Sequence, residues 1–412
     1  MFLLLLYIDP GTGSMLFSLA VGVLSAAWFG VRALLMKAKY RTGGKADTNK
    51  KDIVIYGEDK RYWTTFKGIL DEFERRQVKV TYLAGSADDP LLSQGYRYVE
   101  TEVIGLGNKA YARLNFLNAR IVLATTPGLD VYQWKRSKDV DWYVHLTHYI
   151  GSGIDYRMFG TAFFDALLLS SNIFIPQCRK LESALELGPK DIVPVGCTYM
   201  DYLLERRLSD DVVTESDSVR VLVAPTWGTE SLFHQFGTEL LDQLAAGGYD
   251  ITLRPHPQSY ISNVELIKEL QERYPESALF HWNNDADNYE ALKNADILIS
   301  DYSGIIYDFA FIFERPVIFA RPQSLEFPKT DQFWTREPVW NLAVLPQLGQ
   351  ELSKDNMGEI VGMINHLVHS DQSKESIRRL KEESWLHQGH AAEVVTDYLL
   401  DKCEELKSHA AS

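Results

Sequence analysis

Cysteine is scarce in this 412-residue sequence, which contains only Cys178, Cys197 and Cys403. The three residues lie far apart, their number is odd, and their spacing matches no zinc motif. The sequence therefore predicts no disulfide framework, no metal site and no cofactor. We expect reduced thiols in a cytosolic body.

An excess of positive charge is also absent. The chain has 42 Lys and Arg residues against 56 Asp and Glu residues, so its formal net charge is −14. Because proteins that follow a nucleic-acid backbone need a positive field, this balance argues against nucleic acid as a partner. A small phosphate ligand can still be held locally. The length and the 46% of hydrophobic residues indicate a folded protein of two domains.

One long stretch, from Pro10 to Val31, carries no charge. As a helix that rises about 1.5 Å per residue, it is long enough for the roughly 30 Å of a bilayer core. The turn-forming residues before it predict a spanning helix at about 14–35, within a membrane anchor of residues 1–40. A cleaved signal peptide and a buried core helix are the alternatives. A signal peptide would carry positive charge before the apolar run, and none precedes Arg32.

The residues that follow this stretch are basic and include a linker at 41–51. By the positive-inside rule, they predict a single-pass protein of the inner (cytoplasmic) membrane with its catalytic body in the cytoplasm. The same side chains can contact anionic lipid head groups. They are Arg32, Lys37, Lys39, Arg41, Lys45, Lys50 and Lys51.

Beyond the linker, short apolar runs alternate with longer amphipathic segments, which predicts an α/β fold with parallel strands and crossover helices. We expect an N-terminal Rossmann-like domain at 52–208, a linker at 209–218, a second Rossmann-like domain at 219–370 and C-terminal helices at 371–412. The expected strands are 53–56, 78–83, 120–125, 142–146, 165–169 and 191–195, then 220–224, 251–254, 279–282, 296–300 and 316–319. The expected helices include 62–76, 174–187, 232–246, 264–273, 289–294 and 304–313.

The strand expected at 296–300 runs into the turn Ser300-Asp301-Tyr302-Ser303-Gly304, after which a helix begins. Free backbone N–H groups at a helix start bind anions, Ser303 adds a hydroxyl donor, and Gly304 lets a phosphate approach closely. The turn therefore predicts a site for a nucleotide pyrophosphate. The alternative is that Asp301 or Ser303 is only a helix N-cap.

A second motif, Arg254-Pro255-His256-Pro257, stands at the end of another expected strand. The prolines fix the local backbone, so Arg254 and His256 are held rigidly at the same edge of the second domain. The guanidinium can pair with phosphate oxygens, and a protonated His256 can donate to a bridging or leaving oxygen. The alternative is a histidine that serves turn geometry alone.

The first domain has its own histidine pair. Alternation along the strand predicts that His145 lies within the strand, in the core or in contact with the cleft wall. It places His148 at the strand exit, ahead of the loop Gly151-Ser152-Gly153. At that position His148 can take a proton from an acceptor hydroxyl, and Gly151 and Ser152 would form an acceptor-side loop. A structural role for the lone His148 is the alternative.

These motifs, taken in order, resemble the CDP-glycerol glycerophosphotransferase family of teichoic-acid primases and polymerases. The resemblance runs from about Trp142 to Phe319. It rests on the first-domain histidine and the glycine after it, on residues 195–201 (VGCTYMD) and 222–227 (LVAPTW), on the Arg-Pro-His-Pro motif, and on residues 300–319.

The resemblance implies a GT-B fold, in which two Rossmann-like domains face a cleft. It implies transfer of glycerol phosphate, or a similar polyol phosphate, from CDP-glycerol to a hydroxyl of a lipid-linked or cell-surface glycan acceptor, with release of CMP and without a metal. His148 falls on the family's first-domain base, and His256 on its second-domain histidine. The donor side would comprise Arg254, Thr226, Asp301, Ser303, Gly304 and Asp308.

Within these motifs, the sequence departs from the family at two places. The family usually has Trp-His-Gly where this chain has Thr147-His148-Tyr149, and two serines where it has Ser303-Gly304. Two alternatives therefore stay open: a glycosyltransferase of the same fold that uses a nucleotide sugar, and an inactive membrane scaffold.

Overall fold

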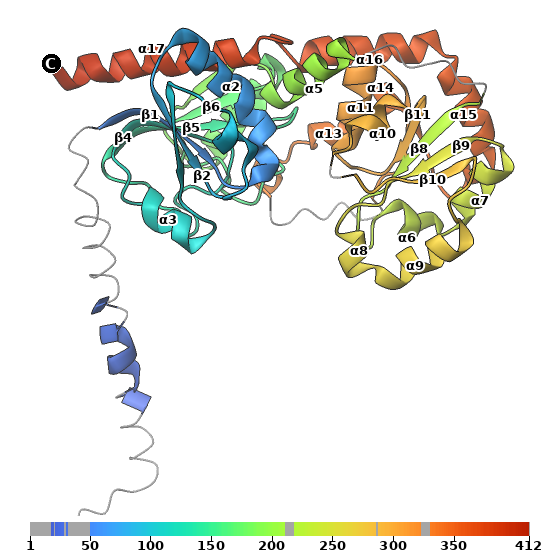
Figure 1. Ribbon diagram of the computed structural model, residues 1–412, viewed down its shortest axis with the longest axis horizontal. Coiled ribbons are helices and arrows are strands. Elements are labelled where there is room, and N and C mark those ends of the chain that lie inside the picture. The colour runs from blue at the N-terminus through green and yellow to red at the C-terminus, as the bar shows by residue number, and fades with distance from the viewer. Residues whose placement is uncertain are drawn as a thin grey trace, which may run out of the picture.

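The structure is a computed structural model that describes residues 18–19, 21–28, 30–31, 50–210, 218–285, 287–322 and 330–411. Two α/β domains stand next to each other, and the described residues between 18 and 31 form a helical segment that lies apart from both (Figure 1). Within the described ranges, no helix is both long enough and apolar enough to cross a membrane. Parts of the predicted span at 14–35, and most of the basic linker at 41–51, lie outside the described residues.

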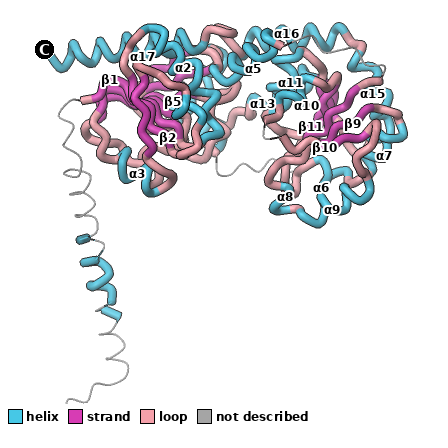
Figure 2. The backbone as a smooth tube through the Cα atoms, in the orientation of Figure 1, coloured by secondary structure: helices cyan, strands magenta, loops and turns pink. Residues whose placement is uncertain are grey.

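The N-terminal domain is built on a seven-stranded parallel sheet with the order β3-β2-β1-β4-β5-β6-β7. Its strands run through the middle of the domain, with helices around them (Figure 2). The central strand β1 is apolar and buried over most of its length, as expected where helices cover both faces of a sheet. The strands are β1 (Lys51–Gly57), β2 (Val80–Ala84), β3 (Val99–Val103), β4 (Ala119–Ala124), β5 (Val140–Leu146), β6 (Ala166–Leu169) and β7 (Asp191–Pro194).

Helices and 3₁₀ turns (η) connect most of these strands, whereas loops alone join β4 to β5 and β5 to β6. The apolar face of α2 packs against α5, and α5 also contacts α11 of the second domain. The elements are η1 (Lys60–Tyr62), α2 (Trp63–Arg76), η2 (Pro90–Ser93), α3 (Asn108–Leu114), η3 (Asn172–Phe174), α4 (Ile175–Ala184) and α5 (Thr198–Ser209), with α11 at Ile305–Phe313.

The C-terminal domain repeats the arrangement with six parallel strands in the order β10-β9-β8-β11-β12-β13. They are β8 (Arg220–Ala224), β9 (Asp250–Leu253), β10 (Phe280–Trp282), β11 (Ile297–Ser300), β12 (Val317–Phe319) and β13 (Gly349–Glu351). The helices are α6 (Leu232–Phe236), α7 (Glu239–Ala246), α8 (Ser259–Ser262), α9 (Val264–Arg273), α10 (Tyr289–Lys293), α11, α12 (Gln332–Thr335), α13 (Trp340–Ala343), α14 (Leu345–Leu348), η4 (Met357–Glu359) and α15 (Ile360–Val368).

Both sheets start at their centre, and the strand order reverses between β1 and β4 and again between β8 and β11. In doubly wound α/β domains, the loops on either side of such a reversal diverge and leave a crevice at the carboxyl edge of the sheet. Each domain therefore has one such crevice, and this fixes where a ligand can bind.

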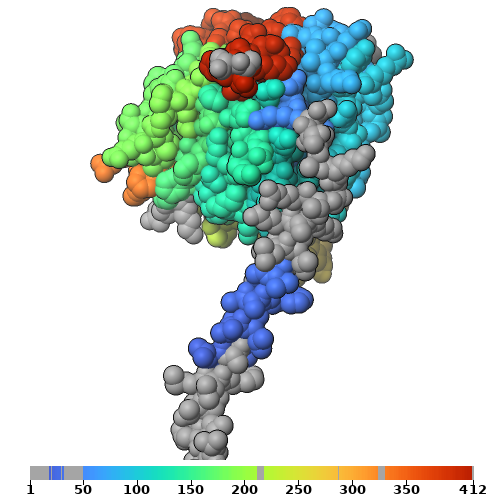
Figure 3. Space-filling view, turned by 90° about the vertical axis from the view of Figure 1, so that its left-hand side faces the viewer, coloured from blue at the N-terminus to red at the C-terminus, as the bar shows by residue number. Residues whose placement is uncertain are grey.

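The last two helices join the domains. The helix α16 (Asp371–Ser384) packs on α11 and α14 of the second domain, whereas α17 (Ala391–Ala411) returns to the first domain and packs on α2, β1 and β4. In Figure 3, α17 lies across the top of the first domain. The sequence predicted these helices but not that α17 completes the first core, to which it adds Val395, Leu399 and Cys403.

Three elements differ from the sequence prediction. The helix expected at 232–246 is two helices, because Gly237 has a φ of 62° and ends α6. The strands β3 and β13 were not predicted, since they lie at sheet edges and are largely exposed, so they lack an apolar run. All three cysteines are unpaired and buried.

Candidate active site

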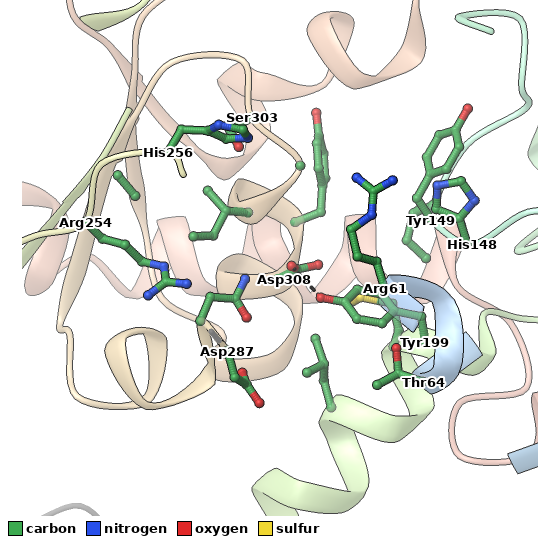
Figure 4. A pocket seen from close by; sticks show the side chains of 18 of the residues that line it. Arg61, Thr64, His148, Tyr149, Tyr199, Arg254, His256, Asp287, Ser303 and Asp308 are labelled. Atoms are coloured by element: carbon green, nitrogen blue, oxygen red, sulfur yellow. Dashed lines mark hydrogen bonds between the residues drawn. The ribbon is translucent and has the colours of Figure 1, made fainter. Parts of the chain in front are cut away.

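The carboxyl edges of the two sheets face each other across a cleft of about 680 Å³. His148 and Tyr149 lie on the first-domain side, and His256 and Ser303 lie on the opposite side (Figure 4). The cleft brings together six residues that the sequence singled out, from both domains. They are His148, Arg254, His256, Ser303, Gly304 and Asp308.

His148 follows β5 and is half-buried in an aromatic cage. Its ring centroid lies 4.9 Å from that of Tyr62, 5.3 Å from Tyr149 and 6.3 Å from Tyr156. Its Nδ1 is 2.8 Å from the hydroxyl oxygen of Thr125. Burial lowers the pKa of His148 to about 4, so the imidazole is neutral at neutral pH and can accept a proton.

The neighbouring His145 lies in the core, as the alternation along the strand predicted. It is fully buried and packs edge-on against Tyr156 and Phe164. Burial lowers its pKa to about 3. This histidine stays neutral and does not line the cleft.

His256 stands between two prolines on the second-domain side. Its Nδ1 accepts a hydrogen bond of 3.1 Å from the backbone N–H of Gln258, and the ring of Trp227 lies 6.5 Å away. Burial lowers the pKa of His256, so the ring is neutral at neutral pH. The lowered pKa disfavours the expected protonated imidazole, although a neutral ring still carries one N–H donor.

Arg254 follows β9 and reaches into the same cleft. Its guanidinium donates to the side-chain oxygen of Asn283 and, over 2.9 Å, to the backbone carbonyl of Asp285. These two bonds orient the guanidinium. Because a guanidinium has five N–H donors, the remaining ones can bind an anion.

Ser303 and Gly304 precede α11, and both line the cleft together with Ile305, so the start of this helix forms part of the cleft wall. A Cβ placed on Gly304 would meet no atom within 4 Å. Packing within the protein therefore does not require glycine here, and a side chain would occupy open cleft space. The position suits an anion that needs close access to the backbone.

Asp301 does not contact the cleft, which corrects its assignment to the donor site. Its carboxylate is fully buried and accepts hydrogen bonds from the backbone N–H and hydroxyl of Thr226 and from the N–H of Leu232, at 2.9 to 3.1 Å. The N–H of Tyr302 donates to the other oxygen at 2.9 Å. Asp301 therefore anchors the loop after β8 to the turn that carries Ser303.

Thr226 is also displaced from its predicted role, because its hydroxyl hydrogen is donated to Asp301. It lines a second hollow of about 470 Å³ rather than the main cleft. The hollow adjoins the cleft, since His256, Ser303 and Gly304 line both.

Asp308 lines the cleft but is engaged across the domain boundary, where it accepts a 2.9 Å hydrogen bond from the hydroxyl of Tyr199 on α5. Burial raises the pKa of Asp308 to about 6. Its carboxylate thus holds α11 against α5 and remains beside the cavity.

The acceptor-side loop predicted at Gly151 and Ser152 is wrong. Both residues are buried beneath the cleft wall and are not among the residues that line it. A Cβ on Gly151 would lie 2.5 Å from the ring of Tyr149. The loop instead presents Tyr149 and Asp155, which are hydrogen-bonded to each other.

Arg61, in η1 after β1, also lines the cleft and was not predicted. Its side chain is 75% exposed and pairs with Asp59 at 2.9 Å. The sequence could have indicated Arg61, since polar residues that follow a central parallel strand lie at the ligand-binding edge of the sheet. Among the described residues, no cluster of three His, Cys, Asp or Glu side chains could hold a metal ion.

Comparison with known proteins gives one family match. Residues 168–335 match the model of a family described as CDP-Glycerol:Poly(glycerophosphate) glycerophosphotransferase. The predicted resemblance, and with it the prediction of a CDP-glycerol glycerophosphotransferase-like enzyme, is confirmed over this stretch. None of the curated proteins matches the chain.

Several solved structures share the fold. A structure of the wall teichoic acid polymerase TagF is 17% identical, covers 93% of this chain and 98% of that chain, and has a TM-score of 0.58. A putative UDP-N-acetylglucosamine 2-epimerase from Listeria monocytogenes is 13% identical over 87% and 98% of the two chains, with a TM-score of 0.57. A UDP-GlcNAc 2-epimerase from Neisseria meningitidis is 12% identical over 85% and 100%, with a TM-score of 0.56. These likenesses confirm a GT-B-like α/β fold.

Proposed function

We propose that this chain, which matches the glycerophosphotransferase family over residues 168–335, transfers glycerol phosphate from CDP-glycerol to a hydroxyl of a lipid-linked or cell-surface glycan acceptor. A similar polyol phosphate would serve the same chemistry. The observation that carries the proposal is the cleft, in which a neutral imidazole from one domain faces an arginine, a second imidazole and a helix start from the other.

The transfer is an in-line displacement at the β-phosphorus of the donor. The acceptor oxygen bonds to that phosphorus while the bond to the bridging oxygen breaks, and the electron pair leaves with CMP. The acceptor proton moves to His148 and later to solvent. Arg254, the N–H of His256 and the start of α11 stabilise the negative charge that builds up on CMP. Phosphoryl transfer depends chiefly on such positioning and electrostatic stabilisation.

Membrane anchoring is part of this proposal. It is supported by the uncharged stretch from Pro10 to Val31 and by the basic residues that follow it. In the described part of this stretch, Leu19, Leu24 and Trp28 are 66%, 69% and 64% exposed, so they pack on neither domain. A catalytic body tethered at the cytoplasmic face would share the plane of a lipid-linked acceptor.

The donor is identified by incubating the purified full-length chain with radiolabelled CDP-glycerol, CDP-ribitol or UDP-sugars and a membrane extract that supplies acceptors. We expect CMP release and a labelled phosphodiester product from a polyol donor. Turnover with nucleotide sugars alone would replace the proposal with glycosyl transfer. This alternative stays open because enzymes named for UDP-GlcNAc share the fold.

Variants test whether the cleft carries the activity. His256→Ala should lower turnover by at least about tenfold, because it removes a donor that stabilises developing charge. His366→Ala changes an exposed histidine on α15 that is not among the residues lining the cleft, and it should keep wild-type turnover. Equal rates in both variants would contradict the site, and a wild-type chain without any turnover would favour an inactive scaffold.

The anchor is tested separately by deleting residues 1–36. The full-length chain should sediment with membranes, whereas the truncated chain should remain in the supernatant and still use a short soluble acceptor. A truncated chain that stays in the membrane pellet would rule out a single N-terminal anchor.

A further inference from the structure

Thr125 follows β4 and stands at the strand reversal of the first sheet, where it is 1% exposed. Its hydroxyl oxygen makes two contacts of equal length. One, of 2.8 Å, is to the backbone carbonyl oxygen of Leu146, and the other, also of 2.8 Å, is to Nδ1 of His148. The chemistry of these two partners decides where the hydrogens lie.

A threonine hydroxyl has one hydrogen to donate, and a backbone carbonyl can only accept. Thr125 must therefore donate to Leu146. Its contact with His148 is then a hydrogen bond only if Nδ1 of the imidazole carries a hydrogen and donates it. The reverse assignment would bring two lone-pair oxygens to 2.8 Å in a buried place with no hydrogen between them, which is unfavourable.

We propose that Thr125 is a positioning residue that holds His148 in the Nδ1–H tautomer and so leaves the Nε2 lone pair for the cleft. The catalytic meaning of this lone pair rests on the proposed function, since it would accept the proton of the acceptor hydroxyl. Thr125 does not touch substrate. It orients the base: its hydroxyl fixes the position of the His148 ring and decides which ring nitrogen carries the hydrogen.

The opposite side of the cleft has the opposite tautomer. Nδ1 of His256 accepts the backbone N–H of Gln258, so in the neutral ring Nε2 must carry the hydrogen. One imidazole therefore offers a lone pair and the other an N–H. The two neutral rings are set for different roles, a proton acceptor and a hydrogen-bond donor, by contacts that hold their Nδ1 atoms.

The surroundings of His148 keep the neutral form, so its tautomer matters. The titratable groups packed around it are Tyr62 from η1, Tyr149 and Tyr156 from the following loop, and the buried His145 on β5. The nearby carboxylate of Asp155 accepts a hydrogen bond from Tyr149. Among the residues that the structure describes, no carboxylate is hydrogen-bonded to His148, and its lowered pKa of about 4 has burial as its cause.

The tautomer is measured directly by ¹⁵N NMR of the full-length chain in detergent, labelled on histidine, with His148 assigned from its absence in His148→Gln. We expect a protonated Nδ1 and a bare Nε2 in the wild type and in Thr125→Ser. Thr125→Val keeps the shape of the side chain but removes the hydrogen-bond acceptor. In this variant the ¹⁵N shift of Nε2 of His148 should move toward the value for a mixture of the two neutral tautomers. A wild-type His148 with its hydrogen on Nε2 overturns the proposal, whether or not any variant folds.

Kinetics give a second readout. Thr125→Val should lower kcat by at least about tenfold with KM changed less than about twofold, and Thr125→Ser should restore most of the rate. The matched control is Thr126→Val, which removes a buried hydroxyl that has no hydrogen-bond partner among the described residues and should leave kcat unchanged. Equal losses in both valine variants would overturn the positioning role. Absence of transfer with every donor would sink the proposed function, while the NMR result would still decide the tautomer.

Discussion

The two sides of the cleft are built by different means. On the second-domain side, short segments fix the functional groups: prolines flank His256, and Ser303 and Gly304 form the turn before a helix. On the first-domain side, His148 is fixed by Thr125, which is 23 residues earlier, and by the ring of Tyr62 from η1. Local backbone geometry therefore builds the anion site, whereas long-range side-chain contacts build the base. This difference explains why the second-domain groups follow from local sequence motifs, whereas the partners that fix His148 do not.

The two sides also differ in charge. The first-domain side places a neutral imidazole among tyrosine rings, and its cation, Arg61, is exposed and paired with Asp59. The second-domain side offers the part-buried guanidinium of Arg254 and a helix start. An anionic donor fits the second side, while a neutral hydroxyl acceptor fits the first.

The largest effect should come from removing the base on the first-domain side. In His148→Ala we expect kcat to fall by about a hundredfold or more, because general-base catalysis contributes about that much, while the KM for the donor stays near its wild-type value. Steady-state assays with varied CDP-glycerol measure both constants. A loss confined to KM would show that His148 binds donor, and the division of labour between the sides would fail.

The buried Asp301, which holds the loop after β8 on the second-domain side, predicts an effect on stability. Asp301→Ala leaves the buried N–H groups of Thr226, Leu232 and Tyr302 without their acceptor, so the free energy of unfolding should fall by about 3 kcal/mol. Chemical denaturation measures it. Asp355→Ala, at an exposed position, is the control and should change stability by less than about 0.5 kcal/mol. Similar values for the two variants would show that the loop after β8 does not depend on Asp301.

The pH dependence of stability should have opposite signs on the two sides. The folded pKa of Asp308 is about 6, above its usual 3.8, so between these values the folded state binds more protons than the unfolded state. Stability due to Asp308 is therefore lost as pH rises through this window. For His148, with a folded pKa of about 4 against its usual 6.5, stability is lost as pH falls through that range.

Unfolding measured from pH 4 to 7 checks these signs. The wild type should lose about 2 kcal/mol relative to Asp308→Asn as the pH rises from 4 to above 6, since the amide does not titrate. Relative to His148→Gln, it should instead gain stability over the same range. A flat difference for Asp308→Asn would mean that the carboxylate is solvated despite its place in the cleft wall.

The smallest effect should come from Arg61, the exposed cation on the first-domain side. Arg61→Gln should raise the KM for donor by about threefold without changing kcat, because an exposed charge paired with Asp59 gives little to binding. Arg254→Gln, on the second-domain side, should raise it by at least about tenfold. If Arg61 proved the more important of the two, the anion site would not belong to the second domain alone.

Several elements could be predicted because their signals are local. Central parallel strands such as β8 and β11 are continuous apolar runs, and α9 has one apolar face, so their periodicity is legible in the sequence. The edge strands β3 and β13 are exposed and lack that pattern. Asp301 was misassigned because a buried anchor and a ligand-binding carboxylate look alike in a strand-to-helix turn. Gly151 and Ser152 were misassigned because loop composition does not reveal which face of a loop is buried.

The sequence by itself determined the α/β class, the resemblance to glycerophosphotransferases and the second-domain half of the cleft, since prolines, glycines and apolar runs act on the backbone within a few residues. Tertiary structure alone decided that α17 closes the first core, that Tyr199 reaches Asp308 across the domain boundary, and that Thr125 meets His148. Those contacts join residues brought together only when strands and helices pack. The hydrogen on a histidine depends on such partners, so its chemistry is set in space rather than along the chain.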